Sequence, residues 1–463
     1  MPLRLLKENM SSMMRGIHLS DLPKTFRDAL VVTRALGQRY IWIDSLCIIQ
    51  DSAEDWSRES IKMHEIYLYS VCNISGTASR GSSTGLFYPR STDALHPLQL
   101  YVMYEGVMQW CYVDNPMRWR LEVEVAPLHQ RAWVLQERIL SPGNLLFGAK
   151  QVLWECRTII ASEVFPKLVP SRYYMRRTKQ ELSQGLFASS PSDVNVDRSN
   201  TWENLLLNYT RCDITFVTDK LVAIGGLAAW FGKGSGDTYL AGMWKENLLW
   251  DLVWYCEARG EREKVYTAPS WSWASVGDGT LNVSWRKEFQ DRGCQLLVTL
   301  IDVKVNLEGD SDFGRVDGGW LILEGRLAKA KFRKGKGKIL DSSLVETENG
   351  MKEMVTEFED ENWTQLWWDR TQVAFSKTER EDGLDLRSDV FLLPVFAREE
   401  MKGLVLKRNT NKEFYRLGMF RAFGQERINV VLEGCAWFEG RAGEMGLETY
   451  DGEHGPRQRI TII

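Results

Sequence analysis

The sequence lacks the cysteine spacing of a zinc protein or of a secreted disulfide scaffold. Its eight cysteines are scattered from Cys47 to Cys435, and no two form a CxxC pair. Several stand inside apolar stretches, as buried free thiols do. We therefore expect reduced core thiols and no metal site.

The chain also lacks a secretory signal peptide, a lipidation motif and any run of eighteen apolar residues, so we expect a soluble cytoplasmic protein without a membrane. The formal net charge is -4, which argues against a nucleic acid as partner because phosphate binding needs clustered cations. Residues Lys233 to Gly236 read KGSG and lack the order of a nucleotide P-loop.

What the chain does contain is typical of a folded protein: 44% hydrophobic and 26% charged residues over 463 positions. This length predicts more than one domain. The patterns favour an α/β core over residues 1–160, a helical continuation over 161–280 and a β-rich, mostly antiparallel domain over 281–463. The nineteen tryptophans are expected mainly in cores and at a domain seam, with Trp271 and Trp273 at that seam.

Tyr40 to Ser75 is the central stretch of the predicted α/β core. Short apolar runs over Tyr40–Ile43 and Leu46–Ile49 predict strand covered on both faces, interrupted by Asp44 and Ser45. A helix is predicted from Ala53 to Tyr69, with Asp51 or Ser52 as its N-cap. A strand over residues 70–75 should follow, pairing in parallel with Tyr40–Ile43 through a right-handed crossover.

Glu59 is the unusual residue of this predicted helix. It shares the apolar face with Trp56, Met63 and Tyr67 at helical spacing. A carboxylate facing a core costs free energy unless it is paired, and it often has a functional role. The alternative is a glutamate at the edge of the face, bound to a backbone N–H or to an arginine.

The motif LPKTFRDALVVTRALGQRYIWIDSLCIIQDSAEDWSRESIKMHEIY, from Leu22 to Tyr67, resembles the heterokaryon-incompatibility (HET) domain of filamentous fungi. Further motifs agree in order, including RAWVLQERILSPGNLLFGAKQVLWEC from Arg131 and APSWSWASV from Ala268. The resemblance covers about the first 280 residues. It implies a cytoplasmic allorecognition protein that triggers programmed cell death, with protein partners and homo-oligomerisation on activation.

HET domains are remotely similar to Toll/interleukin receptor-type (TIR) domains, some of which hydrolyse NAD. The resemblance therefore implies a TIR-like doubly wound parallel sheet with a helical extension, and NAD as a substrate. Trp56-Ser57-Arg58-Glu59 keeps the W-x-x-E arrangement of the TIR catalytic helix. It implies Glu59 as the catalytic residue, with Asp44, Ser45 and Trp56 at the nucleotide, beside the loop over residues 76–85.

The beginning of the sequence departs from the HET pattern. HET domains ordinarily open with a strand reading Y-x-A-L-S-Y-x-W-G, and nothing before Leu22 matches it. The first strand is therefore expected to be missing, which counts against catalysis because such sheets bind ligands at the carboxyl ends of their strands. Two hypotheses remain open: a NAD glycohydrolase and a non-catalytic assembly module. A third, weaker one is a biosynthetic-cluster protein that has borrowed the scaffold.

Other elements are predicted from local signals. A group of His129, Arg131, Trp133 and Glu137 opens a further helix ending at Leu140, and it invites an acid/base hypothesis against the alternative of a structural ion pair. The remaining predictions are a helix over Leu22–Leu36, strands within Pro97–Val113, a hairpin of Leu145–Phe147 with Gln151–Cys156, helices over Thr201–Asn208, Asp219–Phe231 and Asn247–Glu257, a strand or junction at Ala268–Val276, strands at Gln295–Val305, Trp320–Glu324, Val390–Val395, Ile428–Leu432 and Ile460–Ile463, and charged loops at Lys331–Lys338 and Asn349–Asn362.

Overall fold

The computed structural model describes residues 3–90, 98–113, 115, 117–169, 179–187, 198–256, 265–277, 281–282, 290–309, 311–333, 342–354, 363–368, 384–439, 441–445, 449–452 and 455–463. Their contacts form two compact units. Unit 1 comprises residues 1–214 and 222–231, and unit 2 comprises 215–221 and 232–463. Within the described ranges, no helix is both long and apolar enough to cross a membrane.

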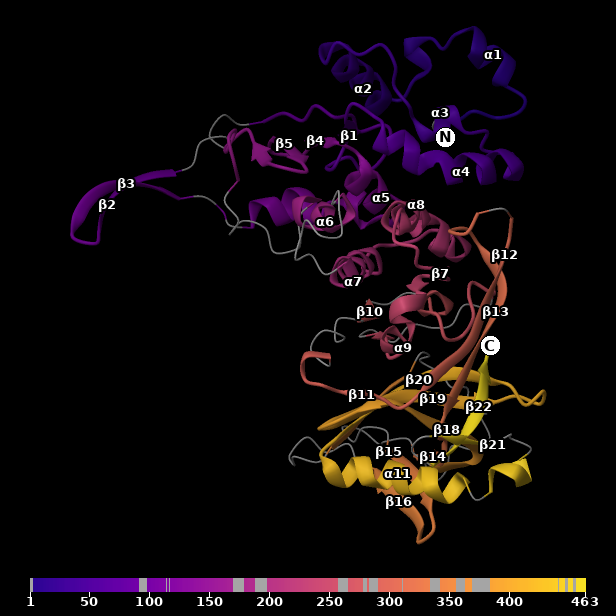
Figure 1. The fold of residues 1–463 in the computed structure, drawn as a ribbon. Coiled ribbons are helices and arrows are strands. Elements are labelled where there is room, and N and C mark those ends of the chain that lie inside the picture. Colours follow the sequence, from indigo (N-terminus) through magenta and orange to yellow (C-terminus); the bar gives the residue numbers. More distant parts are fainter. Residues whose placement is uncertain are drawn as a thin grey trace. The chain divides into compact units, whose positions relative to one another are not determined.

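Unit 1 is built on a four-stranded mixed sheet in the order β1 (Asn73–Ser75), β4 (Gly143–Phe147), β5 (Val152–Cys156) and β6 (Ile160–Ser162). β1 and β4 are parallel, whereas β4, β5 and β6 are successively antiparallel. Figure 1 shows β1, β4 and β5 side by side. The predicted hairpin of Leu145–Phe147 with Gln151–Cys156 is confirmed, because it corresponds to β4 and β5.

The predicted strands at Tyr40–Ile43 and Leu46–Ile49 are wrong. The first run has no regular structure, and Asp44–Cys47 forms the short helix α3. Its turn closes because the Ile43 carbonyl accepts hydrogen bonds from the N–H groups of Leu46 and Cys47, both at 2.9 Å. Tyr40 is 85% exposed, so this run is not buried on two faces. β1 therefore pairs in parallel with β4 and not with the predicted partner.

The two predicted N-terminal helices are confirmed. α2 (Lys24–Ala35) follows Pro23 and ends before Gly37, whose φ of 71° suits glycine. It covers the sheet because Ala29 and Val32 pack in one cluster with Phe147 of β4. α4 (Ala53–Leu68) begins at Ser52, whose hydroxyl accepts the Asp55 N–H.

α5 (Ala132–Leu140) packs against α4 and ends just before β4. The other elements of unit 1 are α1 (Met10–Arg15), the paired strands β2 (Leu98–Tyr104) and β3 (Val107–Val113), a π-helical turn (Arg120–Glu124), a 3-10 turn (Pro127–Gln130), α6 (Lys179–Leu186), α7 (Arg198–Tyr209) and most of α8 (Lys220–Gly232). The helices predicted over Thr201–Asn208 and Asp219–Phe231 correspond to the last two.

Unit 2 contains a twelve-stranded sheet that is antiparallel except for one contact between β20 and β22, as expected for a β-rich domain. Its central path runs β12-β13-β22-β20-β19-β18-β14-β15-β16. The bounds are β11 (Gln295–Leu296), β12 (Thr299–Leu307), β13 (Val316–Gly325), β14 (Ala328–Arg333), β15 (Ser342–Thr347), β16 (Gly350–Met354), β17 (Trp363–Trp368), β18 (Leu384–Ala397), β19 (Glu400–Arg408), β20 (Phe414–Phe423), β21 (Thr449–Gly452) and β22 (Gly455–Ile462).

Several predictions for unit 2 need correction. The apolar run Ile428–Leu432 is not a strand but part of α11 (Gln425–Glu439), because Ile428 and Val431 pack against the core of the large sheet. The predicted charged loops fall partly in β14, in β16 and in the turn before β16, and residues 334–338 and 355–362 lie outside the described ranges. The helix predicted over Asn247–Glu257 is only α9 (Leu248–Asp251), followed by β9 (Tyr255–Cys256), which pairs with β10 (Leu281–Asn282).

Tryptophans fill an inner part of unit 2. Trp271 and Trp273 are 0% and 1% exposed, in a turn that ends in a short 3-10 helix and contains no strand. The Trp254 indole donates to the Trp271 carbonyl at 2.9 Å, and the Trp273 indole donates to Gly242 at 3.0 Å, near the hairpin of β7 (Tyr239–Leu240) and β8 (Met243–Trp244). Both of these hydrogen bonds lie inside unit 2, and the place of Trp271 and Trp273 at a domain seam stays a prediction.

Candidate functional site

Unit 1 contains a carboxyl group with a strongly raised pKa, that of Glu137 on α5. Partial burial of its side chain raises the pKa to about 7, and the nearby negative charge of Asp44 adds to this rise. A hydrogen bond with the Tyr67 hydroxyl and the positive charge of Arg131 act in the opposite direction. Near neutral pH this carboxyl is therefore divided between its two protonation states, as an acid/base group must be.

Three separate elements bring these groups together. Asp44 starts α3, Tyr67 lies near the end of α4, and Glu137 is on α5. Burial raises the pKa of Tyr67 well above its usual value, so the phenol stays protonated and donates to Glu137. Its ring meets Trp42 edge to face, with centroids 5.8 Å apart. We call Asp44, Tyr67, Arg131 and Glu137 the carboxyl cluster.

A second aromatic pair joins α4 to α5. The Trp56 and Trp133 rings meet edge to face, with centroids 6.4 Å apart and an interplanar angle of 85°. Trp56 was predicted at the nucleotide. Its described ring contact is with this second indole, which fixes the α4 turn that also carries Glu59.

Glu59 lies on α4 with its side chain 22% exposed. Its carboxylate is 3.2 Å from Arg58 Nε and 3.6 Å from Lys62 Nζ, which matches the alternative of a paired glutamate at the edge of the apolar face. Glu59 and Asp44 nevertheless share a neighbourhood, because both negative charges, after burial itself, raise the pKa of the Cys47 thiol. Two of the predicted site residues, Asp44 and Glu59, are therefore close enough to the Cys47 thiol of α3 to affect its pKa.

Ser45 was also predicted at the nucleotide. Its backbone N–H donates to the Asp44 carboxylate at 2.6 Å, and its carbonyl accepts the Leu5 N–H at 2.8 Å. Its hydroxyl is buried and has no hydrogen-bond partner among the residues that the structure describes. A buried hydroxyl without a partner costs free energy, so it is available to a bound polar group.

The glycine-rich loop after β1 is tied to α2. The Leu86 N–H donates to the Asp28 carboxylate at 2.8 Å, and the Gly85 N–H donates to the Thr25 hydroxyl at 3.0 Å. Partial burial raises the pKa of Asp28, but the hydrogen bond from Leu86, the ammonium of Lys24 and the backbone N–H of Phe87 lower it further, so the net pKa is below the usual value. These contacts agree with an ordinary connecting loop, and its approach to a ligand stays a prediction.

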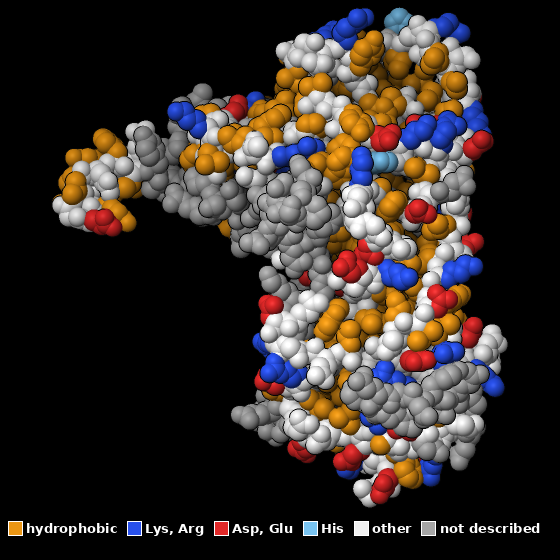
Figure 2. Space-filling view, viewed as in Figure 1, with side chains coloured by type: hydrophobic (Ala, Val, Ile, Leu, Met, Phe, Trp, Pro, Cys, Tyr) orange, Lys and Arg blue, Asp and Glu red, His pale blue; other side chains and the backbone are white. Residues whose placement is uncertain are grey.

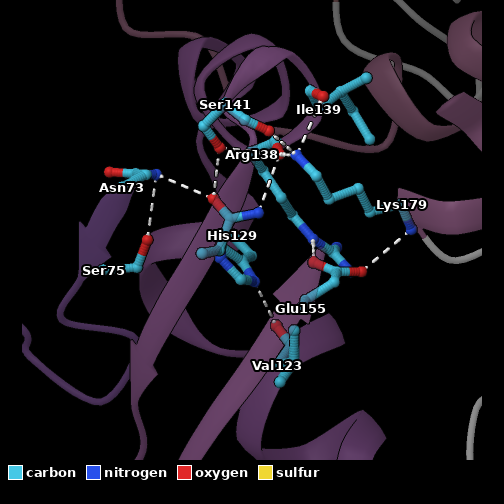
Figure 3. Close-up of polar contacts among 10 residues, drawn as sticks. Asn73, Ser75, Val123, His129, Arg138, Ile139, Ser141, Glu155 and Lys179 are labelled. Atoms are coloured by element: carbon cyan, nitrogen blue, oxygen red, sulfur yellow. Dashed lines mark hydrogen bonds and ion pairs between the residues drawn. The ribbon is translucent and has the colours of Figure 1, made fainter. Parts of the chain in front are cut away.

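The other side of α5 carries a buried ionic group that the sequence did not reveal (Figure 3). Arg138 binds Glu155 of β5 through two hydrogen bonds of 2.6 and 2.7 Å, and Glu155 is fully buried. Although burial raises the pKa of Glu155, the guanidinium holds it below the usual value. The periodicity of β5 alone could have identified this glutamate as inward-facing.

Lys179 completes this group at the start of α6. Its backbone N–H donates to Glu155 at 2.9 Å, and its ammonium donates to the carbonyls of Arg138, Ile139 and Ser141 at the end of α5. Burial lowers the pKa of Lys179 to about 7. A cation at the carbonyls that end a helix acts as a C-cap, here for α5.

His129 is not suited to acid/base chemistry in this fold. It is 7% exposed, and burial lowers its pKa to about 3. Its Nδ1 lies 2.9 Å from the Val123 carbonyl and must donate to it. The neutral ring is a structural hydrogen-bond donor, so only Glu137 and Arg131 of the predicted group join the carboxyl cluster.

Within the described ranges, no group of three or more His, Cys, Asp or Glu side chains could hold a metal ion.

Residues 4–137 match the family described as heterokaryon incompatibility protein (HET). No curated protein and no solved structure matches the chain. The matched residues include the whole carboxyl cluster and end at Glu137.

Proposed function

The chain carries a heterokaryon incompatibility (HET) domain over residues 4–137, and from this premise we propose that it acts in heterokaryon incompatibility by triggering programmed cell death. The observation that carries the proposal is the position of the carboxyl cluster. Asp44, Tyr67 and Glu137 come from three separate elements, Arg131 stands at the start of α5, and all four lie inside the matched residues. A cytoplasmic, fungal setting belongs to this proposal.

For the chemistry, we propose cleavage of NAD at the bond between nicotinamide and ribose. This bond breaks with its electron pair going to the nicotinamide nitrogen, and water adds to the sugar carbon to give ADP-ribose and a proton. The Glu59 carboxylate would stabilise the positive charge that develops on the ribose. Glu137 would accept the proton of the attacking water, since its pKa of about 7 suits a general base.

The proposed chemistry assumes that the domain is related to TIR domains. This assumption is supported by the W-x-x-E arrangement of Trp56 and Glu59 and not by the strand order of the sheet. The non-catalytic assembly module is the second candidate. It is favoured by the ion pairs of Glu59 with Arg58 and Lys62, because a paired carboxylate needs no chemical role.

Release of nicotinamide from NAD by the purified full chain tests the chemistry. Glu59→Gln should abolish release, whereas Glu65→Gln, a matched change at an exposed position of the same helix, should leave it unchanged. Equal rates in the wild type and Glu59→Gln would remove Glu59 from the mechanism.

Growth of a filamentous fungus that expresses the full chain from an inducible promoter tests the cellular role separately. Arrest of growth without NAD loss would favour the assembly module. Normal growth at high protein levels, in strains of several compatibility types, would count against the proposed role itself.

A further inference from the structure

The hairpin of β2 and β3 is unpartnered among the strands that the structure describes. Its seven residue pairs run from Leu98 opposite Val113 to Tyr104 opposite Val107. The turn consists of Glu105 and Gly106, with φ values of 51° and 80°. Two positive φ values are typical of a type I′ turn, which matches the twist of a hairpin. The turn therefore favours this hairpin locally, but an isolated two-stranded hairpin is only marginally stable in water.

The hairpin exposes apolar side chains on both of its faces: Leu100, Tyr104 and Val107 on one, and a set with two aromatic rings on the other. Tyr101 lies opposite Trp110, and Met103 lies opposite Met108, so these four side chains share a face. They are 53%, 63%, 63% and 42% exposed in that order. The two aromatic rings stack at a tilt, with centroids 5.1 Å apart. We call these four side chains the hairpin face; Figure 2 shows hydrophobic side chains gathered on this hairpin.

The size of the hairpin face indicates what could cover it. Its four side chains expose roughly 500 Å², and an equal face on a partner would bring the buried total to about 1,000 Å², the lower limit of a specific interface. A partner with an identical face meets this requirement without further surface.

The lack of positive charge on the hairpin also favours a second copy of the chain as its partner. Between Leu98 and Val113 the only ionisable carboxylate is that of Glu105, at the turn, and there is no lysine or arginine. The hairpin thus offers no cation to an acidic peptide or an anionic membrane. In an antiparallel pair of hairpins, the turn of each would lie near the open end of the other, so the two Glu105 carboxylates would be separated.

We propose that the hairpin face docks onto the same face of a second copy of this chain, forming a two-fold dimer. Packing of two hairpins face to face would shield both sets of aromatic side chains, and each would stabilise the other. Such an interface is isologous, because the same four side chains of both copies form it. The dimer is inferred from the hairpin alone and does not depend on the proposed cleavage of NAD.

Sedimentation velocity of the purified full chain, from about 1 to about 100 µM, tests the dimer. The wild type should shift from monomer to dimer as concentration rises. Met103→Glu should move the midpoint at least about tenfold higher, because it buries a charge in the interface. Met14→Glu, at a position 80% exposed on α1, is the matched control and should leave the midpoint unchanged.

A second variant covers the case in which Met103→Glu disrupts the hairpin itself. Glu105→Asn places a residue that accepts positive φ at the turn, so it should preorganise the hairpin and tighten association. A wild type that stays monomeric throughout the range would overturn the proposal. So would equal midpoints for the wild type, Met103→Glu and Glu105→Asn, or a monomer that co-sediments with phosphatidylcholine vesicles, which would assign the face to lipid. Since the readout is association and not NAD loss or growth, its failure leaves the proposed function standing.

Discussion

Replacing Glu137 by glutamine should make unit 1 more stable above neutral pH. The amide keeps an acceptor for the Tyr67 hydroxyl but cannot ionise. In the wild type the folded-state pKa is about 7, against 4.5 for an ordinary glutamate. Between these values the folded state binds more protons than the unfolded state, so stability falls as pH rises through this window.

The size of the effect follows from the difference between the two pKa values. Each unit corresponds to about 1.4 kcal/mol, which gives about 3 kcal/mol once pH exceeds the folded pKa. The carboxyl group is partly exposed, so solvent screening reduces our expectation to about 2 kcal/mol. The stabilisation by Glu137→Gln should be small at about pH 5 and nearly complete at about pH 8.

Urea unfolding of the full chain, followed by hydrogen exchange of peptides from α5, measures this change in unit 1 separately from unit 2. The difference between variant and wild type cancels the titrations of Lys179 and His129, which both proteins share. Glu65→Gln, at an exposed position of α4, is the matched control and should show no pH-dependent difference. Parallel pH profiles for the wild type and Glu137→Gln would refute the raised pKa and, with it, the assignment of Glu137 as an acid/base group.

Three further changes test the packing around α5. Glu155→Gln should destabilise unit 1 by about 3–5 kcal/mol in urea unfolding, since it leaves a buried guanidinium without its charged partner; a loss below about 1 kcal/mol would contradict that burial. Gly143→Ala should cost about 1–3 kcal/mol because its Cβ would collide with the Trp154 ring, whereas Gly81→Ala, in open space, should change the melting temperature little. His129→Gln should flatten the stability loss that the wild type shows as pH falls from about 6.5 towards 3, because the unfolded histidine gains a proton there; an unchanged slope would place that loss elsewhere.

Local signals were sufficient for much of the fold. The Ser52 cap, the i, i+3, i+4 pattern of α4, and the glycine after α2 each act within a few residues, and the corresponding helices are confirmed. Short apolar runs were ambiguous. Tyr40–Ile43 lacked a strand to pair with, and Ile428–Leu432 became helical because its apolar side chains pack on the large sheet. Such outcomes depend on contacts distant in sequence, which periodicity does not contain.

The site was predictable only in part. Asp44 and Glu59 were implied by the family resemblance, and Glu59 also stood out by its place on an apolar helix face; their roles at a nucleotide stay predictions. Glu137 was noticed beside His129, but its actual partners are Tyr67 and Asp44. Those residues lie about 70 and 90 positions away in the sequence, and no spacing rule connects them.

The ammonium cap on α5 has a consequence for where this domain can be cut. The family match ends at residue 137, yet the carbonyls at the end of α5 bind Lys179, and β1 has β4 as its described neighbour in the sheet. A protein ending at the family boundary would lose the cation, the neighbouring strand and the Arg138 ion pair together. The matched segment is therefore shorter than the segment whose contacts complete α5 and its sheet, and we expect that a fragment intended to stand alone must continue at least through α6.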